Sequence, residues 1–396
     1  MQYPVDHDFT AVWTPEQAEA IEIRPELIPP AIDPAFPVIS NEVWLWDTWP
    51  LTDLEMHPVR IDGWHVIFGL VAPREIPFDD RHAVAKIGWF SSRDGCQWSY
   101  RGTVIAADSM IGAREWSGSA VLIQDQIHLF YTTVGHHPEV LPNWMQTDAE
   151  QRIAMATAIP ISTAEALELG GAEFTDSRVI AEGDGKLYQN YEQGRESEIL
   201  YGFRDPFVFA EDDAIYMTFT GNRGGPGCFT GNIGLARART TDLTSWELLA
   251  PLLQAEGVNQ QLERPHLVRD KGLHYLFFLS HTETFASGLI GPDGLYCFVG
   301  EGLRSDYQPV NGAGIVLANQ LDCPYERYGD YVMPNWLVEA FIDTVGERRG
   351  GTLAPTVKLH ADGDQITISG QLGYGEIPAM ASVTSPLRMG LFKSIR

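Results

Sequence analysis

The sequence predicts an all-β fold, a five-bladed β-propeller that forms one domain over residues 1–396. Three observations lead to this prediction. The chain is 44% apolar and 11% aromatic, which is enough for a large buried core. Most apolar segments are short, rich in β-branched and aromatic residues, and separated by Asp, Gly and Asn turns, as β-strands are. A strand–turn–strand pattern also recurs, with no low-complexity linker to divide the chain.

Two short helices are expected beside the strands. Segment 14–17 (TPEQ) is a capping box with Pro at the first helical position, and it predicts a helix over about residues 14–21. Segment 162–171 (STAEALELGG) predicts a second helix, capped by Ser162 or Thr163 and ended after about Leu169 by two glycines. The predicted strand segments are 64–72, 85–92, 119–135, 206–221, 266–281 and 336–343.

The recurring pattern is a polar opening motif, a short strand, an acidic or Gly turn, and a returning strand with paired aromatics. EWSGSAVLIQDQIHLFYTT, RDPFVFAEDDAIYMTFTG and ERPHLVRDKGLHYLFFLSH are clear copies, WDTWPL with DGWHVIFGL is a fourth, and YVMPNWLVEAFID is a degenerate fifth. Repeats that start roughly 60 to 90 residues apart have room for the four strands of a propeller blade. The innermost strands of a propeller open at one central channel, so we expect the opening residues to meet there. They are Asp47, Ser117, Asp205, Glu263 and about Tyr331.

The charge of the chain excludes several kinds of partner. Its formal net charge is −26, from 53 acidic and 27 basic side chains. Nucleic acids and anionic membranes are bound through clustered Lys and Arg, so neither is an expected partner. The basic residues are 22 Arg and only 5 Lys. This imbalance fits a salt-tolerant source and equally fits ordinary drift toward acidic residues, and both explanations stay open.

Cysteine spacing and the N-terminal segment exclude further classes. The four cysteines lie far apart without a C-x-x-C pair, so neither a zinc site nor a thiol redox motif is indicated. No P-loop, H-E-x-x-H or G-x-S-x-G motif occurs. The first residues lack a basic and then apolar leader, and no apolar run approaches the ~18 residues of a membrane span. We therefore expect a soluble chain without a recognisable signal peptide.

Three of the repeat openers are carboxylates: Asp47, Asp205 and Glu263. Retaining glycosidases use a pair of carboxyl groups about 5 Å apart, one as nucleophile and the other as acid and base. A third carboxylate can hold sugar hydroxyls and stabilise an oxocarbenium-like state. The alternative is that Asp205 and Glu263 only form ion pairs with Arg204 and Arg264. Neighbouring residues of a strand point to opposite faces, which weakens that alternative.

Five motifs together resemble glycoside hydrolase family 68, the levansucrases, inulosucrases and related β-fructofuranosidases. They are WDTWPL, REWSGSA, FRDP, the ERPH of NQQLERPHLV, and SHTETF, and their order and spacing agree from Phe36 to about Pro378. The resemblance implies a five-bladed propeller with a central funnel-shaped active-site pocket. It also implies a retaining reaction on sucrose, with sucrose and fructan or other sugar acceptors as binding partners.

The resemblance assigns a role to each matched position. Asp47 is the implied nucleophile, Glu263 the general acid/base, and Asp205 the transition-state stabiliser that holds the 3- and 4-hydroxyls of the fructosyl ring. The implied substrate-binding residues are Trp46 and Trp116, which pack on the sugars, Ser117, which orients the nucleophile, Arg204, which bridges the fructosyl and glucosyl sides, Gln261, which contacts the glucosyl unit, and His281 and Tyr328.

Two departures from the family pattern refine these expectations. Calcium-binding members carry Asp three residues before the acid/base, where this chain has Gln260. We therefore expect no structural calcium, and no metal or other cofactor. Gln261 and His281 are typical of the Gram-negative or archaeal branch, in which product length varies.

The leading hypothesis is a sucrose-cleaving fructosyltransferase of the levansucrase type that works outside the cell. A mainly hydrolytic β-fructofuranosidase or an inulosucrase is the alternative within the same chemistry, because loops at the pocket rim decide between them. A non-catalytic carbohydrate-binding propeller is a distant alternative, since binding alone does not need carboxylates at three openings. The sequence leaves the linkage, the product length and the oligomeric state open.

Overall fold

The computed structural model describes residues 9–106, 109–137, 139–163, 165–169, 174–195 and 197–378, and these are mostly β-strands with few and short helices. None of the helices in these ranges is long and apolar enough to cross a membrane. The helices are α1 (Pro15–Glu19), α2 (Trp144–Thr147) and α3 (Tyr191–Gly194), with 3-10 turns η1 (Pro25–Leu27), η2 (Phe78–Val84), η4 (Thr282–Thr284) and η5 (Val310–Gly312). The strands are β1 (Ala11–Val12), β2 (Val43–Thr52), β3 (Arg60–Ile61), β4 (Trp64–Pro73), β5 (Lys86–Ser92), β6 (Ser99–Thr103), β7 (Arg114–Ile123), β8 (Gln126–Val134), β9 (Gln151–Ala158), β10 (Pro160–Ser162), β11 (Leu167–Leu169), β12 (Thr175–Ala181), β13 (Phe203–Glu211), β14 (Ala214–Asn222), β15 (Gly231–Ala238), β16 (Trp246–Gln254), β17 (Glu263–Asp270), β18 (Leu273–Ser280), β19 (Gly294–Gly300), β20 (Gln308–Pro309), β21 (Ile315–Ala318), β22 (Arg327–Val332), β23 (Leu337–Val345), β24 (Arg348–Leu353), β25 (Pro355–Asp362) and β26 (Gln365–Tyr374).

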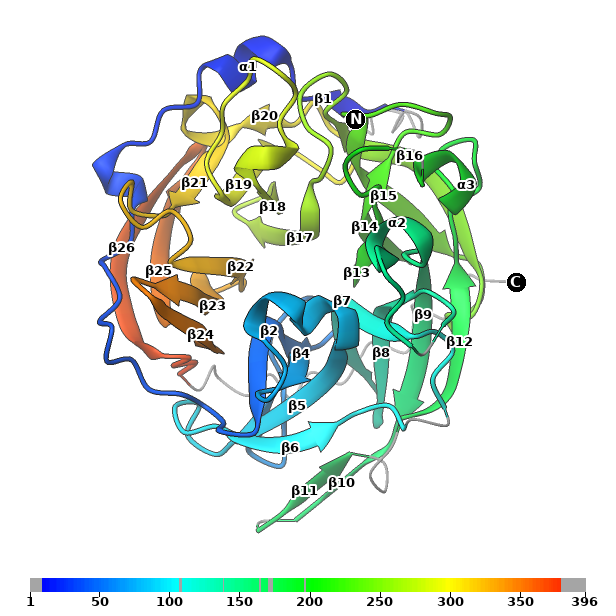
Figure 1. The fold of residues 1–396 in the computed structure, drawn as a ribbon, viewed down its shortest axis with the longest axis vertical. Coiled ribbons are helices and arrows are strands. Elements are labelled where there is room, and N and C mark those ends of the chain that lie inside the picture. The colour runs from blue at the N-terminus through cyan, green and yellow to red at the C-terminus, as the bar shows by residue number, and fades with distance from the viewer. Residues whose placement is uncertain are drawn as a thin grey trace.

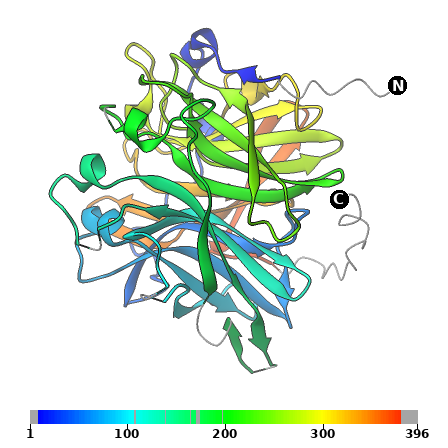
Figure 2. The same cartoon turned by 90° about the vertical axis from the view of Figure 1, so that its right-hand side faces the viewer.

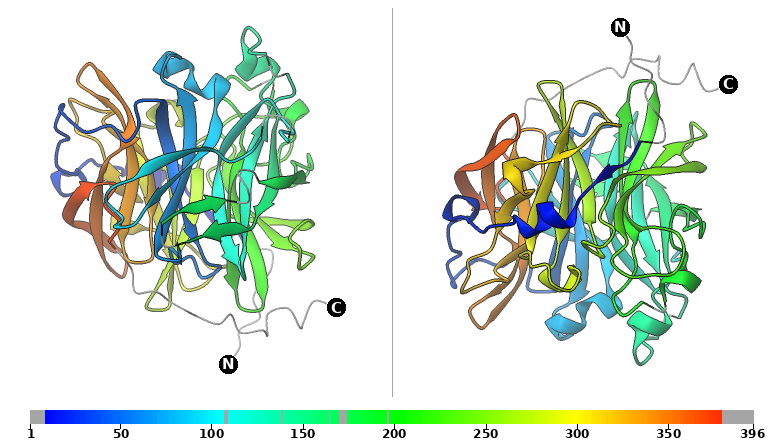
Figure 3. Two further views of the ribbon diagram at one scale, coloured as in Figure 1. Left: turned by 90° about the horizontal axis from the view of Figure 1, so that it is seen from below. Right: turned by 90° about the horizontal axis from the view of Figure 1, so that it is seen from above.

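The strands form antiparallel meanders arranged around a common centre (Figure 1). Three sheets each hold five strands: β13 to β16 with β1, β17 to β21, and β22 to β26. A nine-stranded sheet combines two meanders, β2 to β6 and β7, β8, β9 and β12. A short parallel pairing joins them, in which Leu51 and Thr52 lie opposite Ala120 and Val121. The strands of the different sheets run along roughly one direction, with connecting loops at both ends (Figures 2 and 3).

One strand of each meander lies at the centre of the molecule. These strands are β2, β7, β13, β17 and β22, and each contacts the next in that order, with β22 contacting β2 again. They contain the repeat openers recognised in the sequence. The predicted strand segments are confirmed as β4, β5, β7 with β8, β13 with β14, β17 with β18, and β23.

Each central strand carries a β-bulge at the same place relative to its partner strand. The pairing register shifts between residues 46 and 49, 116 and 118, 204 and 207, 263 and 266, and 328 and 331. Bulges bend a strand and redirect a side chain, and they are frequent next to active sites. Three bulge residues have a left-handed backbone although they are not glycine: Asp47 (φ 47°), Asp205 (φ 59°) and Arg264 (φ 48°).

The positions of the bulges correct the alignment of the repeats that the sequence predicts. Arg264, not Glu263, takes the position of Asp47 and Asp205, and Glu263 takes the position just before the bulge. At the position of Asp47, Asp205 and Arg264 the fifth repeat has Gly329, two residues before the predicted Tyr331. Its degenerate sequence hid this start, because the bulge residue there is a glycine with φ 74° rather than a carboxylate.

The first predicted helix is confirmed and the second is wrong. In α1 the Thr14 hydroxyl accepts a hydrogen bond from the Gln17 amide, and the Gln17 side chain accepts one from the Thr14 amide. Segment 160–169 instead forms the hairpin β10–β11, which extends away from the other sheets in Figure 1. The Thr163 hydroxyl accepts hydrogen bonds from the amides of Glu165 and Ala166, so it stabilises a turn rather than a helix start. The two glycines expected to end that helix lie outside the described residues.

The N-terminal segment joins two sheets. β1 pairs in parallel with β16, with Ala11 opposite Leu253. Trp13, which is fully buried, packs its ring against Phe278, Phe285, Tyr296 and Phe298 of the β17–β21 sheet and the loop beside it. Burial of one large aromatic side chain stabilises a fold by several kcal/mol, about 3–5 by truncation to Ala. This tryptophan therefore holds neighbouring sheets together around the centre.

Candidate active site

A cavity of about 850 Å³ opens at the centre, at the end of the inner strands where the bulges lie. All ten site residues expected from the sequence line it. They come from all five meanders and the loops beside them, which explains why residues so far apart in the chain meet. They are Trp46, Asp47, Trp116, Ser117, Arg204, Asp205, Gln261, Glu263, His281 and Tyr328.

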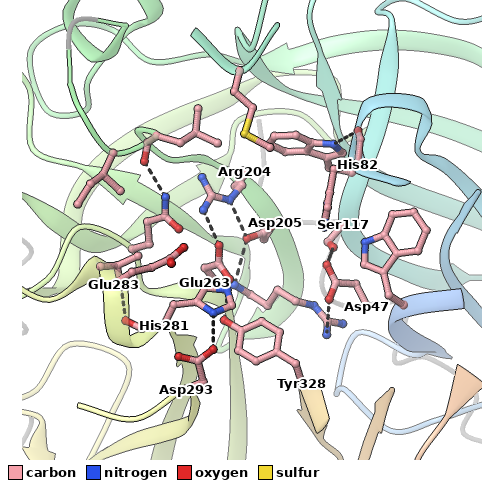
Figure 4. A pocket seen from close by; sticks show the side chains of 18 of the residues that line it. Asp47, His82, Ser117, Arg204, Asp205, Glu263, His281, Glu283, Asp293 and Tyr328 are labelled. Carbon is pink, nitrogen blue, oxygen red and sulfur yellow. Dashed lines mark hydrogen bonds and ion pairs between the residues drawn. The ribbon is translucent and has the colours of Figure 1, made fainter. Parts of the chain in front are cut away.

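Asp47 lies on the bulge of β2 and is fixed from two sides. The Ser117 hydroxyl donates a hydrogen bond of 2.8 Å to Asp47 Oδ2 (Figure 4). The Arg264 guanidinium lies 3.8 Å from Asp47 Oδ1 and donates to the backbone carbonyls of Gly329 and Thr48, each at 2.5 Å. Arg264 thus places a positive charge beside Asp47 and ties β17 to β22 and β2.

Asp205 lies on the bulge of β13 and is almost fully buried. Its Oδ2 accepts hydrogen bonds from the Thr220 hydroxyl at 2.9 Å and the Arg264 amide at 3.1 Å. Burial raises the pKa of Asp205 to about 6, and the neighbouring charge of Arg204, 3.5 Å away, limits the rise. Asp205 is therefore a buried carboxylate held in one orientation by two hydrogen bonds.

Glu263 is surrounded by hydrogen-bond donors. Arg204 Nη2 donates to Glu263 Oε1 at 2.7 Å, and the Tyr328 hydroxyl donates to Oε2 at 2.8 Å (Figure 4). His281 Nε2 lies 3.4 Å from the same Oε2. Burial acts to raise the pKa of Glu263, but His281 and Arg204 together outweigh it and hold the pKa well below its usual range. Without substrate, Glu263 is therefore ionised.

His281 carries the proton that Glu263 lacks. Its Nδ1 lies 2.9 Å from Asp293 Oδ2, and its ring stacks on Tyr328 at 4.3 Å between ring centroids. Burial lowers the pKa of His281, but the hydrogen bonds with Asp293 and Glu263 more than compensate and raise it to about 10. Asp293, His281 and Glu263 form a chain of interacting groups, with the imidazole ring between the two carboxylates (Figure 4).

Trp46 and Trp116 form an apolar wall on the Asp47 side. Trp46 is 1% exposed and Trp116 is 7% exposed. The Trp116 ring nitrogen donates to the carbonyl of His82 at 3.4 Å, and the His82 ring meets Trp46 edge-on at 5.4 Å. Burial and the charge of Arg81 lower the pKa of His82 to about 3, so this ring is neutral.

The two glutamines before Glu263 are held differently. Gln261 lines the cavity, and its Nε2 donates to the Leu200 carbonyl at 2.8 Å. Gln260 is fully buried, and its Oε1 accepts a hydrogen bond from the Thr230 amide. Among the described residues, no group of three or more His, Cys, Asp and Glu side chains is arranged to hold a metal ion.

Two parts of this arrangement were not found from the sequence. The first is Asp293, which lies in a loop and has no motif; only its distance of twelve residues from His281 connects them in the chain. The second is Arg264, for which the sequence suggests only an ion pair with Glu263. It faces Asp47 instead, because its bulge turns it away from Glu263. Arg204, in contrast, does contact both Asp205 and Glu263.

Comparison with known proteins shows the family. The model of the levansucrase/invertase family, glycoside hydrolase family 68, matches residues 3–230 and 227–378. An extracellular sucrase of Zymomonas mobilis is 38% identical over 387 residues, covering 88% of this chain and 90% of the relative. A levansucrase of Erwinia amylovora is 36% identical over 429 residues, covering 94% and 97%. The chain therefore belongs to glycoside hydrolase family 68 and is an enzyme.

Solved structures agree with this assignment. An inulosucrase from Halalkalicoccus jeotgali bound to kestose superposes with a TM-score of 0.87 at 36% identity, covering 93% of this chain and 97% of that one. A levansucrase from Gluconacetobacter diazotrophicus gives a TM-score of 0.85 at 32% identity, covering 96% and 95%. The earlier expectation of this family is thus confirmed.

Proposed function

We propose that the enzyme is a sucrose-cleaving fructosyltransferase of the levansucrase type, which makes fructan or fructo-oligosaccharides by a retaining mechanism. The observation that carries the proposal is that Asp47, Asp205 and Glu263 line one cavity in three different hydrogen-bond environments. Family membership and the names of the relatives, a sucrase and several levansucrases, support sucrose as the donor.

The fold proposed for residues 1–396 is one five-bladed β-propeller domain with a funnel-shaped central pocket. The cyclic contacts of β2, β7, β13, β17 and β22 support it, as does the bulge at the same place in each. The parallel pairing of β2 with β7 links two blades into one sheet without changing their order.

In the first step, Asp47 attacks the anomeric carbon C2 of the fructosyl unit. The C2–O bond to glucose breaks, and Glu263 gives a proton to the departing oxygen. Ser117 keeps the attacking carboxylate in place by its hydrogen bond to Oδ2. The proton on His281 reaches Glu263 across the 3.4 Å between Nε2 and Oε2 when substrate binds and excludes water.

In the second step, Glu263 takes a proton from the acceptor hydroxyl, which attacks C2 and releases Asp47, and this proton then returns to His281, which restores the starting state. Two displacements at C2 retain its configuration. Asp205 holds ring hydroxyls of the fructosyl unit throughout, without forming a covalent bond. Arg204, which contacts both Asp205 and Glu263, bridges the fructosyl and glucosyl sides, and Gln261 contacts the glucosyl unit.

Trp46 and Trp116 pack on the fructosyl ring from the apolar wall, and Tyr328 and His281 border the leaving group. Apolar walls with a few converging polar groups are typical of sugar and other small-molecule sites. Gln260 stands where calcium-binding members carry Asp, and its Oε1 accepts a hydrogen bond from the Thr230 amide, so we propose no structural calcium here. No step of this mechanism uses a metal or another cofactor. The extracellular name of one relative supports action outside the cell.

Incubation with sucrose tests the proposal, with glucose and fructose measured separately. We expect glucose in excess of free fructose, because part of the fructose is transferred. Equal amounts of glucose and free fructose would favour a β-fructofuranosidase, and absence of glucose release would reject the cleavage of sucrose. NMR of the products distinguishes β-2,6 from β-2,1 linkages, and so a levansucrase from an inulosucrase. An Asp47→Asn variant should retain less than about a thousandth of wild-type turnover while remaining folded.

A further inference from the structure

Few aromatic side chains in the part of the chain that the structure describes are exposed, and one of these few lines the cavity. Among the Phe, Trp and Tyr residues that the structure describes, only Phe9 and Tyr325 are exposed. Tyr325 is 62% exposed, far more than Phe9 at 39%, and it lines the cavity, whereas Phe9 does not. Its ring has no ring contact or side-chain hydrogen bond within the described residues. Packing does not explain why the Tyr325 ring is this exposed, so another role for it is expected.

The loop that carries Tyr325 is rigidly held. Asn319 clamps it at both ends: its Nδ2 donates to the carbonyls of Pro324 and Arg327, and its Oδ1 accepts from the Arg327 amide. The carbonyl of Tyr325 itself accepts a hydrogen bond from the Thr344 amide at 3.0 Å. The backbone that carries the ring is therefore fixed before binding, so only the side chain of Tyr325 is left to be ordered by a ligand.

The position of the ring relates it to the reacting groups. Tyr325 precedes Tyr328 by three residues, and the Tyr328 hydroxyl touches Glu263. Exposure increases along the cavity wall from Trp46 at 1% and Trp116 at 7% to Tyr325 at 62%, so Tyr325 lies at the mouth. The cavity volume of about 850 Å³ is near the upper end of the usual range of about 300–1,000 Å³, which leaves room beyond a disaccharide.

We propose that Tyr325 is an outer binding platform for oligosaccharide acceptors, on which a sugar unit beyond the one that reacts stacks its C–H face. This inference rests on the proposed function and adds a residue that favours longer acceptors over water. An aromatic face binds the apolar side of a sugar ring and tolerates different linkages, because it makes no directed hydrogen bond. Among the other residues that line the cavity, Arg195 and Glu283 are charged and exposed and offer no such face. Tyr191 is less exposed than Tyr325, and the Arg195 guanidinium lies over its ring at 5.9 Å from the centroid.

The test compares Tyr325→Ala and Tyr325→Phe with a matched control, Leu321→Ala. Leu321 lies on the same loop and is 75% exposed, but it does not line the cavity. We measure glucose release at low sucrose, the apparent KM for the trisaccharide kestose as acceptor, and the lengths of the products. Tyr325→Ala should raise the KM for kestose about threefold to tenfold and shorten the products, while glucose release at low sucrose stays within about twofold.

Tyr325→Phe keeps the ring face and should behave like the wild type, as should Leu321→Ala. An unchanged KM and product length in Tyr325→Ala would overturn the inference. Equal losses in Tyr325→Phe, or in the Leu321 control, would overturn it too. A second measurement separates this inference from the proposed function. Saturation-transfer NMR follows kestose binding to two proteins that cannot turn it over: the Asp47→Asn variant and the Asp47→Asn variant that also carries Tyr325→Ala. Absence of glucose release by the wild type would reject the proposed function alone. Equal kestose binding by the two Asp47→Asn proteins would reject the binding platform at Tyr325 alone.

Discussion

Replacing Asp293 by Asn tests how the proton for the leaving group is held. Asp293 accepts the His281 Nδ1 proton at 2.9 Å and the Thr282 amide proton at 2.7 Å. It does not contact Glu263, which lies on the other side of the imidazole ring (Figure 4). Asn has the same size but no charge, so the substitution changes the electrostatics of His281 and leaves the cavity wall in place.

The magnitude follows from the strength of the lost interaction. A hydrogen bond to a charged group contributes about 1.5–3 kcal/mol, and one pKa unit corresponds to about 1.36 kcal/mol. The pKa of His281, raised to about 10 by Asp293 and Glu263 against the effect of burial, should therefore fall by about 1 to 2 units. A raised histidine pKa keeps the proton available until the pH passes that value. The alkaline limb of the kcat/KM profile should consequently move to lower pH by about 1 to 2 units.

Glucose release from sucrose between pH 5 and 11 is the assay, with thermal unfolding as a check on the fold. Glu283→Gln is the matched control, because Glu283 also lines the cavity two residues after His281 but does not bond to it. The control should keep the wild-type profile. An unmoved alkaline limb in folded Asp293→Asn would refute the role assigned to the Asp293–His281–Glu263 chain.

Three further substitutions test other parts of the structure. Ser117→Ala should lower kcat about tenfold to a hundredfold in the sucrose assay, since Asp47 loses its 2.8 Å hydrogen bond; a smaller loss than threefold contradicts this. Gly118→Ala should abolish folding or lower the free energy of unfolding by more than about 3 kcal/mol in chemical denaturation, because a Cβ there would lie 1.9 Å from a backbone oxygen. The control Gly302→Ala, where a Cβ would have no atom within 4 Å, should change the free energy of unfolding by less than about 1 kcal/mol. Glu339→Gln should stabilise the fold relative to the wild type at pH 8 by up to about 3 kcal/mol more than at pH 4.5. Burial raises the pKa of Glu339 from 4.5 to about 7, so the wild-type fold loses stability as pH rises through that window, and Gln removes this loss. Equal effects of the substitution at both pH values would show that folding does not shift the pKa of Glu339.

The strands and the set of site residues could be predicted because both follow from local sequence patterns. Short runs of β-branched and aromatic residues between turn residues define the strands, and every strand segment predicted on this basis is present. The ten expected site residues line one cavity because polar motifs open the inner strands. Their individual roles came from the family motifs, since spacing alone does not separate Asp47 from Asp205.

The helix predicted over 162–169 failed for a local reason. A Ser or Thr followed by acidic residues stabilises a helix start or a turn through the same side-chain hydrogen bonds, and only the later chain decides between them. Here Pro160–Ser162 pairs with Leu167–Leu169, and Trp64 and Arg93 donate to the Thr163 carbonyl, which fixes the turn. These partners lie about 70 to 100 residues away, beyond any window of local sequence.

The register at the centre could not be predicted because it depends on backbone conformation. Sequence spacing locates the start of each inner strand but does not say which of two neighbouring residues occupies the bulge. In β17 the bulge residue is Arg264, a residue that rarely adopts φ near 48°, and such strain persists only where the surroundings enforce it. Its two 2.5 Å bonds to backbone carbonyls are that enforcement. The consequence is chemical: the fourth repeat gives a cation beside Asp47 and leaves Glu263 facing Arg204, Tyr328 and His281, so one bulge sets the surroundings of both the proposed nucleophile and the proposed acid/base.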